Sequence, residues 1–142
     1  MLLTLNFAAV LFMAGLGWLV QVVAYPLFAL VGNDRFTAFH AEWSRRIGAV
    51  VIIPMSVDLI TSIWLALAPP HGVNVVLAAS GAALAVITWL STALLQVPRH
   101  SELSNGFARE THTRLVRSSW LRTFCWSAHA VICILMVSEQ LA

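Results

Sequence analysis

The sequence predicts an all-α membrane protein, an antiparallel bundle of four transmembrane helices. The chain has 142 residues, of which 60% are hydrophobic and only 10% are charged. Soluble domains carry about 25% charged residues, so this chain could not cover a water-facing surface. Disordered chains are polar and rich in charge, which excludes that class as well. The remaining class is a protein embedded in a membrane, with a single transmembrane domain over residues 1–142.

Four apolar segments have the length that a membrane crossing needs. The hydrocarbon core is about 30 Å thick, and a helix crosses it in about 20 residues. Continuous apolar runs of this length form helices and lack the alternation of β-barrel strands. Asp58 and Arg122 are the charged residues within these runs. The segments are 2–31, 47–68, 73–97 and 118–138.

Local signals extend two of these helices and disturb three of them. Asn105-Gly106 is typical of a helix end, so the third helix is predicted to continue to about Leu103. The fourth is predicted to begin ahead of its apolar run. Prolines 26, 54 and 98 lie within or beside the apolar runs, and each is expected to kink its helix. The predicted helices are therefore 2–31, 47–68, 73–103 and 112–138.

The arginines predict how the bundle is oriented. Lysine is absent, and seven of the eight arginines lie in the first and third connections, 32–46 and 98–117. The second connection, 69–72, has no charge. Positive charge marks cytoplasmic loops, so connections one and three are predicted to be cytoplasmic and both termini to lie outside. Arginines at the ends of apolar runs are topology signals, and no nucleic-acid partner is expected.

Small residues mark one face of the third helix. Its small residues include pairs at four-residue spacing, which lets helices approach closely in lipid; they are Ala78, Ala79, Gly81, Ala82, Ala83 and Ala85. This face is expected either to pack inside the bundle or to form a homodimer interface. Both alternatives fit the sequence, and a larger membrane complex is a third possible assembly.

Polar groups within the apolar segments need partners, because ionisable side chains are costly in a bilayer. Asp58 lies near the middle of the second span, and His129 lies at a similar depth in the fourth. Gln21 is about as deep in the first. We predict that the three meet and that Asp58 accepts a hydrogen bond from His129. This group is either a structural clasp or a site that handles protons or a ligand.

A second set of side chains predicts an aromatic-lined cavity open to the cytoplasmic side, with Arg122 near its mouth. A flat aromatic ligand would suit such walls, and Arg122 could stabilise an oxyanion. The alternative is an ordinary aromatic belt at the membrane interface with a snorkelling arginine. The expected lining residues are Gln21, Tyr25, Trp89, Gln96, His100, Trp120, Arg122 and Trp126.

Histidines near the predicted cytoplasmic side are weak candidates for metal ligands. His40, His100 and His112 have glutamates close by in sequence. Imidazole and carboxylate groups bind iron, copper and zinc, but no strong ligand spacing such as HExxH is present. No metal site and no cofactor are therefore predicted, although haem, a quinone or a metal would be compatible with the sequence.

Several stretches together resemble a known family. They are Tyr25-Pro26-Leu27-Phe28, Phe39-His40 with Arg45-Arg46-Ile47, Trp89 to Pro98 with His100 and Asn105-Gly106-Phe107, Arg114 to Arg117, and Trp120 to Thr123. In this order they resemble a bacterial four-helix membrane family of unassigned function, whose superfamily includes the fungal anthrone oxygenases. The resemblance spans nearly the whole chain. It implies the inner membrane of a bacterium as the location.

The resemblance also implies a chemistry. Anthrone oxygenases are similar to oxygenases without metal or flavin, in which the deprotonated phenolic substrate itself reacts with oxygen. Such chemistry needs a base, an aromatic pocket and an oxyanion partner. Asp58 or His100, the tryptophans and Arg122 could fill these roles, with His129 beside Asp58. The family pattern favours Glu at position 58 and Arg at position 129, so this chain departs from it at both positions.

Three functions are compatible with the sequence. The first is an oxygenase or oxidoreductase that acts on a flat, lipophilic aromatic or quinone-like molecule without a tightly bound cofactor. The second is a non-catalytic subunit or assembly factor of a larger membrane complex, because the chain is small and lacks a strong catalytic motif. The third is a small carrier of protons or a metal ion, for which Asp58 and the histidines are the support.

Overall fold

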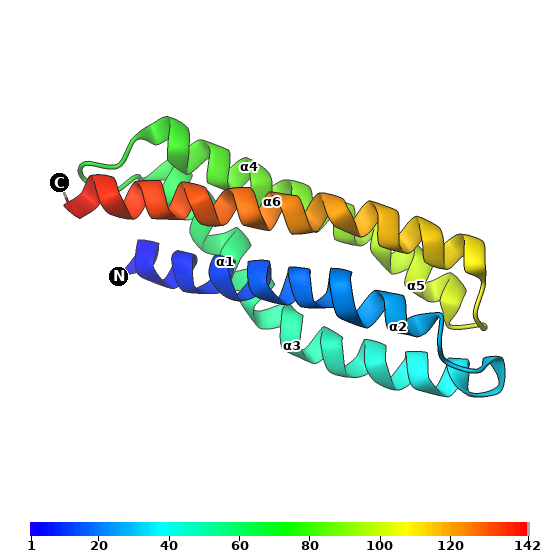
Figure 1. Cartoon of the computed structure of the whole chain (residues 1–142). Helices are drawn as coiled ribbons and strands as arrows, with labels where there is room; N and C mark the ends of the chain where they lie inside the picture. Colours follow the sequence, from blue (N-terminus) through cyan, green and yellow to red (C-terminus); the bar gives the residue numbers. More distant parts are fainter. Residues whose placement is uncertain (142) are drawn as a thin grey trace.

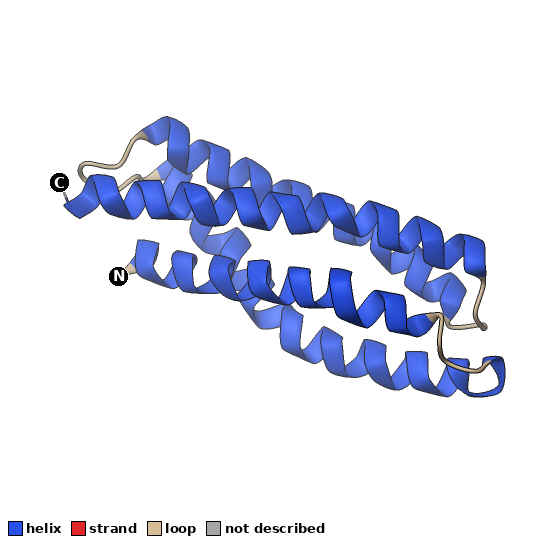
Figure 2. Ribbon diagram, viewed as in Figure 1, coloured by secondary structure: helices blue, strands red, loops and turns tan. Residues whose placement is uncertain are grey.

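The computed structural model describes residues 1–141 as four long helices (Figure 1). The first consists of α1 (Leu2–Leu19), the π-helix η1 (Val20–Ala24) and α2 (Tyr25–Phe28). The second is α3 (Asn33–Leu67). The third consists of α4 (Val75–Ser91), the π-helix η2 (Thr92–Gln96) and α5 (Val97–Leu103), and the fourth is α6 (Arg109–Leu141). Within this described part no strand occurs (Figure 2).

The helices alternate in direction, so both termini lie at one end of the bundle and the connections 29–32 and 104–108 lie at the other (Figure 1). We call these the terminal end and the loop end. The first helix packs against α3 and α6, and α4 also packs against α3 and α6. This arrangement confirms the predicted four-helix bundle.

The four continuous helices are each long and apolar enough to cross a membrane. Large apolar side chains also cover the outside of the bundle. Ile53 is 70% exposed and Leu94 is 68% exposed. Water-soluble monomers seldom expose apolar surface on this scale. The helices and their outer surface therefore match a lipid environment.

The second helix begins much earlier than predicted, at Asn33 instead of residue 47. The charges of this segment made it resemble a loop, but they lie on one helix face. Glu42 accepts hydrogen bonds from Arg45 and Arg46 at 2.8 and 2.6 Å, three and four residues further on. The opposite face is apolar and packs into the bundle. The fourth helix likewise begins at Arg109, three residues ahead of the predicted position 112.

Two of the three prolines are accommodated by π-helices at the loop end. The N–H of Tyr25, just ahead of Pro26, donates to the carbonyl of Val20. The N–H of Val97, just ahead of Pro98, donates to the carbonyl of Thr92 in the same way. These bonds span five residues, and the wider turn takes up the local disturbance that a proline ring causes.

Small residues of α4 pack inside the bundle. Ala78, Gly81 and Ala85 are buried. A Cβ atom at Gly81 would lie 2.8 Å from Nε2 of His129 on α6. The face was predicted either to pack inside the bundle or to form a dimer interface. These three residues pack inside the bundle.

Replacing Gly81 with alanine is expected to destabilise the protein by about 1–3 kcal/mol, the usual cost of an overpacked core. The reason is that the His129 ring is buried and cannot turn away from the added methyl group. Thermal unfolding in a mild detergent measures the effect. Gly15→Ala is the matched control, because a Cβ atom there would have no neighbour within 4 Å. Equal stability of the two variants would contradict this packing.

Candidate functional site

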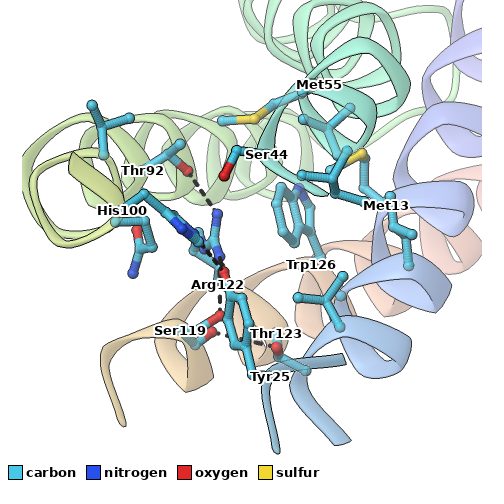
Figure 3. A pocket seen from close by; sticks show the side chains of 18 of the residues that line it. Met13, Tyr25, Ser44, Met55, Thr92, His100, Ser119, Arg122, Thr123 and Trp126 are labelled. Carbon is cyan, nitrogen blue, oxygen red and sulfur yellow. Dashed lines mark hydrogen bonds between the residues drawn. The ribbon is translucent and has the colours of Figure 1, made fainter. Parts of the chain in front are cut away.

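A cavity of about 260 Å³ lies between the four helices (Figure 3). We call it the central cavity. Five of the predicted lining residues do line it, namely Tyr25, Gln96, His100, Arg122 and Trp126. Further walls come from residues that the sequence did not single out, among them Met13, Trp43, Ser44, Gly48, Met55 and Ser119. The walls are mainly apolar, and a few polar groups converge on one side.

Arg122 is the cationic group of the central cavity (Figure 3). Its Nη2 donates to the Tyr25 hydroxyl at 3.2 Å and to Ser119 Oγ at 3.0 Å. Its Nη1 donates to Thr92 Oγ1 at 3.4 Å. These partners are all neutral, and no carboxylate of residues 1–141 forms a salt bridge with the guanidinium. The positive charge is therefore available to an anionic group in the cavity.

Two buried polar atoms beside the cavity have unused hydrogen-bonding capacity. Arg122 Nε and Ser44 Oγ are both buried, and neither has a partner among the described residues. Buried polar atoms in proteins nearly always have a partner, so such atoms at a cavity point to a ligand or to ordered water. The two side chains come from α6 and α3 and face the same space.

A row of hydrogen bonds leads from Arg122 toward the loop end. The Tyr25 hydroxyl lies 3.2 Å from His100 Nε2, and His100 Nδ1 lies 3.0 Å from His40 Nε2. Because arginine only donates, the Tyr25 oxygen accepts from Arg122 and its hydrogen is free to bond His100 Nε2. We assign the tautomers accordingly, with the Nδ1 hydrogen of His100 directed at His40. The groups therefore form a directed path for a proton.

Aromatic side chains pack together between the central cavity and the loops. Phe28 and Phe36 are fully buried and pack against each other with ring centres 6.0 Å apart. Phe28 also packs against Trp43, whose ring stacks on His100 at 5.4 Å. The cavity was predicted to open toward this end, and these rings pack between it and the connections.

The three histidines named as weak metal candidates do not converge. His40 and His100 contact each other, whereas Nε2 of His112 bonds the backbone carbonyl of Tyr25 at 2.8 Å. Over residues 1–141, no group of three or more metal-binding side chains comes together. His40 and His100 are placed to exchange a proton along the row that starts at Arg122.

Asp58 and His129 meet in the interior, as predicted, but outside the central cavity. His129 Nδ1 lies 3.4 Å from Asp58 Oδ1, and both side chains are about 1% exposed. The predicted hydrogen bond is not formed, since both ring nitrogens of His129 lack a partner within the described chain. The Asp58 carboxylate instead accepts from Ser62 Oγ and from Trp126 Nε1, each at 3.1 Å.

Gln21 does not join Asp58 and His129, so this part of the prediction was wrong. Its Nε2 donates to the Val116 carbonyl at 3.1 Å, nearer the loop end. The depth of Asp58 was counted from residue 47, but α3 begins at Asn33, so Asp58 lies farther from the loop end than assumed. Asn6 of α1 lies at this level instead and donates to Ser62 Oγ at 2.8 Å.

Three predicted lining residues lie outside the central cavity: Gln21, described above, Trp89 and Trp120. Trp89 donates from Nε1 to the Met55 carbonyl at 3.0 Å and joins α4 to α3. Trp120 packs on the outer surface against Trp18 and Phe124, with ring centres 5.6 and 5.2 Å apart. Trp120 is two residues from Arg122, and residues at this spacing on a helix do not share a face.

The α3 wall of the cavity was missed because its first half was interpreted as a loop. Trp43 and Ser44 line the cavity from residues 33–46. A helical signal was nevertheless present, because Phe36, His40, Trp43 and Ile47 recur at spacings of four, three and four residues. That spacing places aromatic and imidazole rings on one helix face toward the bundle.

No protein-family model, curated protein or solved structure matches this chain. The chemistry of the site therefore comes from its own residues. The central cavity combines an apolar space, a cation that no carboxylate of residues 1–141 pairs with, and a row of groups that can pass a proton. Together these groups can bind a lipophilic molecule by an oxygen atom and remove a proton from it.

Proposed function

We propose that the protein is a membrane oxidoreductase that binds a flat, lipophilic phenol or quinone-like molecule in the central cavity and activates it for reaction with oxygen. No tightly bound cofactor takes part in this proposal. The observation that carries it is the Arg122 guanidinium. It faces an apolar cavity to which the described residues contribute no carboxylate, and it begins the row Tyr25, His100 and His40.

The size and the walls of the cavity suit a small aromatic ligand. Pockets for drug-sized ligands measure about 300–1,000 Å³, so a cavity of about 260 Å³ suits a molecule of two or three fused rings. Trp43 and Trp126 offer flat apolar walls, and Arg122 and Ser44 offer donors for ligand oxygen atoms. A ligand oxygen that becomes negative gains most from Arg122, because the charge develops next to a preorganised donor.

Proton removal follows from the hydrogen-bond row. A phenol, or the enol form of a ketone such as anthrone, bound at Arg122 loses its hydroxyl proton to the Tyr25 oxygen as the Tyr25 hydrogen passes to His100 Nε2. The Nδ1 hydrogen of His100 can then pass to His40. The substrate is left as an oxyanion beside the guanidinium, and the proton is held by the histidine pair. Positioned general bases of this kind contribute about 10²–10⁴-fold to reaction rates.

The oxygen step uses molecular oxygen as its co-reactant. With anthrone as the substrate, the anion transfers one electron to oxygen and the two radicals combine at the ring carbon to form a peroxide. Loss of the remaining hydrogen from that carbon, with cleavage of the O–O bond, leaves a carbonyl. One oxygen atom stays in the quinone product and the other leaves in water, so anthrone and oxygen yield anthraquinone and water.

The test uses the purified protein in lipid vesicles. Binding is measured with 1,8-dihydroxyanthraquinone through quenching of tryptophan fluorescence, and turnover is measured as oxygen consumption with anthrone above the rate of protein-free vesicles. We expect saturable binding and accelerated oxidation, with no stoichiometric iron, copper or zinc. Absence of both activities would sink the proposal and would favour the non-catalytic subunit. A stoichiometric bound metal would remove its cofactor-free part.

A leucine at Gly48 is expected to abolish binding of 1,8-dihydroxyanthraquinone. Gly48 lines the cavity, and a Cβ atom there would have no neighbour within 4 Å, so the longer side chain would extend into the ligand space. Gly15→Leu is the matched control, because Gly15 is equally unhindered but does not line the cavity. Normal binding by the Gly48 variant would show that the ligand lies elsewhere.

We also infer an orientation in which the loop end faces the cytoplasm, in the inner membrane of a bacterium. The support is the distribution of charge, because Arg35, Arg109 and Arg114 lie next to the connections of this end and the opposite connection at 69–72 is uncharged. A reporter enzyme that works only outside the cytoplasm, fused after the C-terminus, is expected to be active. An inactive fusion would reverse the orientation.

A further inference from the structure

We propose that Asp58 is a positioning residue for the central cavity: it holds the Trp126 indole as one wall and thereby places Arg122. This role differs from that of a base, which the sequence allowed for Asp58. The inference rests on the proposed function of the cavity for its ligand, but the contact itself is a property of the bundle interior.

Trp126 connects Asp58 with the cavity. The indole is 3% exposed, lines the cavity, and donates its Nε1 hydrogen to Asp58 Oδ2 at 3.1 Å. Asp58 lies behind this ring and does not line the cavity. A proton from the ligand would have to cross the indole, whose nitrogen only donates. Asp58 can therefore act on the ligand through the position of Trp126.

The carboxylate accepts a hydrogen bond from its own helix, and residues of α1 and α6 stand beside that contact. Ser62 Oγ on α3 donates to Oδ1 at 3.1 Å, and Asn6 on α1 donates to that serine oxygen at 2.8 Å. The His129 ring on α6 stands 3.4 Å from Oδ1. The Trp126 N–H therefore donates to an acceptor that is itself hydrogen-bonded, so a fixed Asp58 carboxyl group fixes the indole as well.

Trp126 also contacts the two groups that shape its side of the cavity. The Arg122 guanidinium carbon lies 5.9 Å from the centre of the ring, one helical turn away on α6. A Cβ atom at Gly17 would lie 3.4 Å from Trp126 Cε3, so the glycine lets the indole pack closely against α1. Rotation of the ring would therefore displace the guanidinium that is proposed to bind the ligand.

A double-mutant cycle tests the proposal, with 1,8-dihydroxyanthraquinone as the probe. Asp58→Leu is expected to weaken binding about tenfold, and Trp126→Phe by a similar factor. The double variant is expected to bind no more weakly than Trp126→Phe alone, because groups that act through one contact are not additive. Asp58→Asn is expected to bind within about threefold of the wild type, since its Oδ1 can still accept the indole hydrogen.

A spectroscopic measurement separates this inference from the proposed function. The near-ultraviolet circular dichroism of the wild type minus that of Trp126→Phe reports the fixed Trp126 ring without any ligand. Asp58→Asn should keep this signal and Asp58→Leu should lose it. If the signal behaves so but the wild type binds no probe, the positioning role stands and the proposed ligand fails.

Other outcomes would overturn the positioning role. Additive effects of Asp58→Leu and Trp126→Phe on binding would show that the two residues act independently. Loss of anthrone turnover in Asp58→Asn with unchanged probe binding would make Asp58 a base. If Asp58→Leu does not fold, Asp58→Asn and Trp126→Phe still decide the question, because an altered Trp126 signal in the asparagine variant contradicts the proposal.

Discussion

Replacing Arg122 with glutamine is expected to weaken binding of 1,8-dihydroxyanthraquinone by about 10- to 100-fold. Hydrogen bonds to a charged group contribute about 1.5–3 kcal/mol, which corresponds to that range in the dissociation constant. Glutamine keeps a hydrogen-bond donor but removes the positive charge of the guanidinium. The hydrogen-bond partners of that guanidinium include no carboxylate. The loss should be larger for a phenolate than for a neutral ring of the same shape, because the interaction depends on charge.

Arg117→Gln is the control for this variant. Arg117 is an exposed residue of the same helix and does not line the cavity, so its replacement changes the net charge equally without touching the ligand. Titration of tryptophan fluorescence gives both dissociation constants, and thermal unfolding confirms that both variants fold. Equal affinities for the Arg122 and Arg117 variants would remove Arg122 from the binding site.

Replacing His100 with asparagine is expected to lower the turnover of anthrone by about 10²–10⁴-fold, the usual contribution of a positioned general base. The dissociation constant for 1,8-dihydroxyanthraquinone should change much less, because Arg122 and the apolar walls remain. Asparagine can still contact the Tyr25 hydroxyl, but it cannot take up a proton at neutral pH. Oxygen consumption and probe binding are measured on the same preparation.

The pH dependence gives this variant a signature of its own. Without the histidine, hydroxide must remove the proton from anthrone, so the remaining rate should rise steadily with pH. His112→Asn is the control, because His112 lies at the same end of the bundle but contacts the Tyr25 backbone and takes no part in the row to His40. A comparable loss of turnover in both variants would indicate a disturbed helix end instead of a lost base.

The four helices could be predicted from the sequence because the thickness of a membrane sets the length of each apolar run. No particular contact between helices is needed to recognise such a run. The first helix was predicted to begin at residue 2 and the third at residue 73, and they begin at Leu2 and Val75. The start of α3 was missed because Glu42, Arg45 and Arg46 made residues 33–46 look like a loop. On a helix these charges share one face and pair with each other, while His40 and Trp43 turn inward.

The candidate site could be predicted in its components and only partly in its geometry. Tyr25, Gln96, His100, Arg122 and Trp126 do surround one cavity, since aromatic and polar residues at the same depth of different helices tend to meet. Trp89 and Trp120 were predicted to line the cavity and do not. The neighbour that a helix face contacts depends on how the helix is rotated about its own axis. Spacing along one helix defines a face but does not determine that rotation.

The sequence by itself therefore determined the class of protein, the number of its helices and the charge at each connection, because these depend on composition and on length along the chain. Only the tertiary structure decided that Asp58 lies behind Trp126, that Arg122 has neutral partners, and that His40 continues the row from His100. The contacts of Asp58 with Trp126, of Arg122 with Tyr25, and of His40 with His100 each join residues more than 50 positions apart. Their formation depends on how four helices are rotated and shifted against one another, which the pattern of a single helix does not contain.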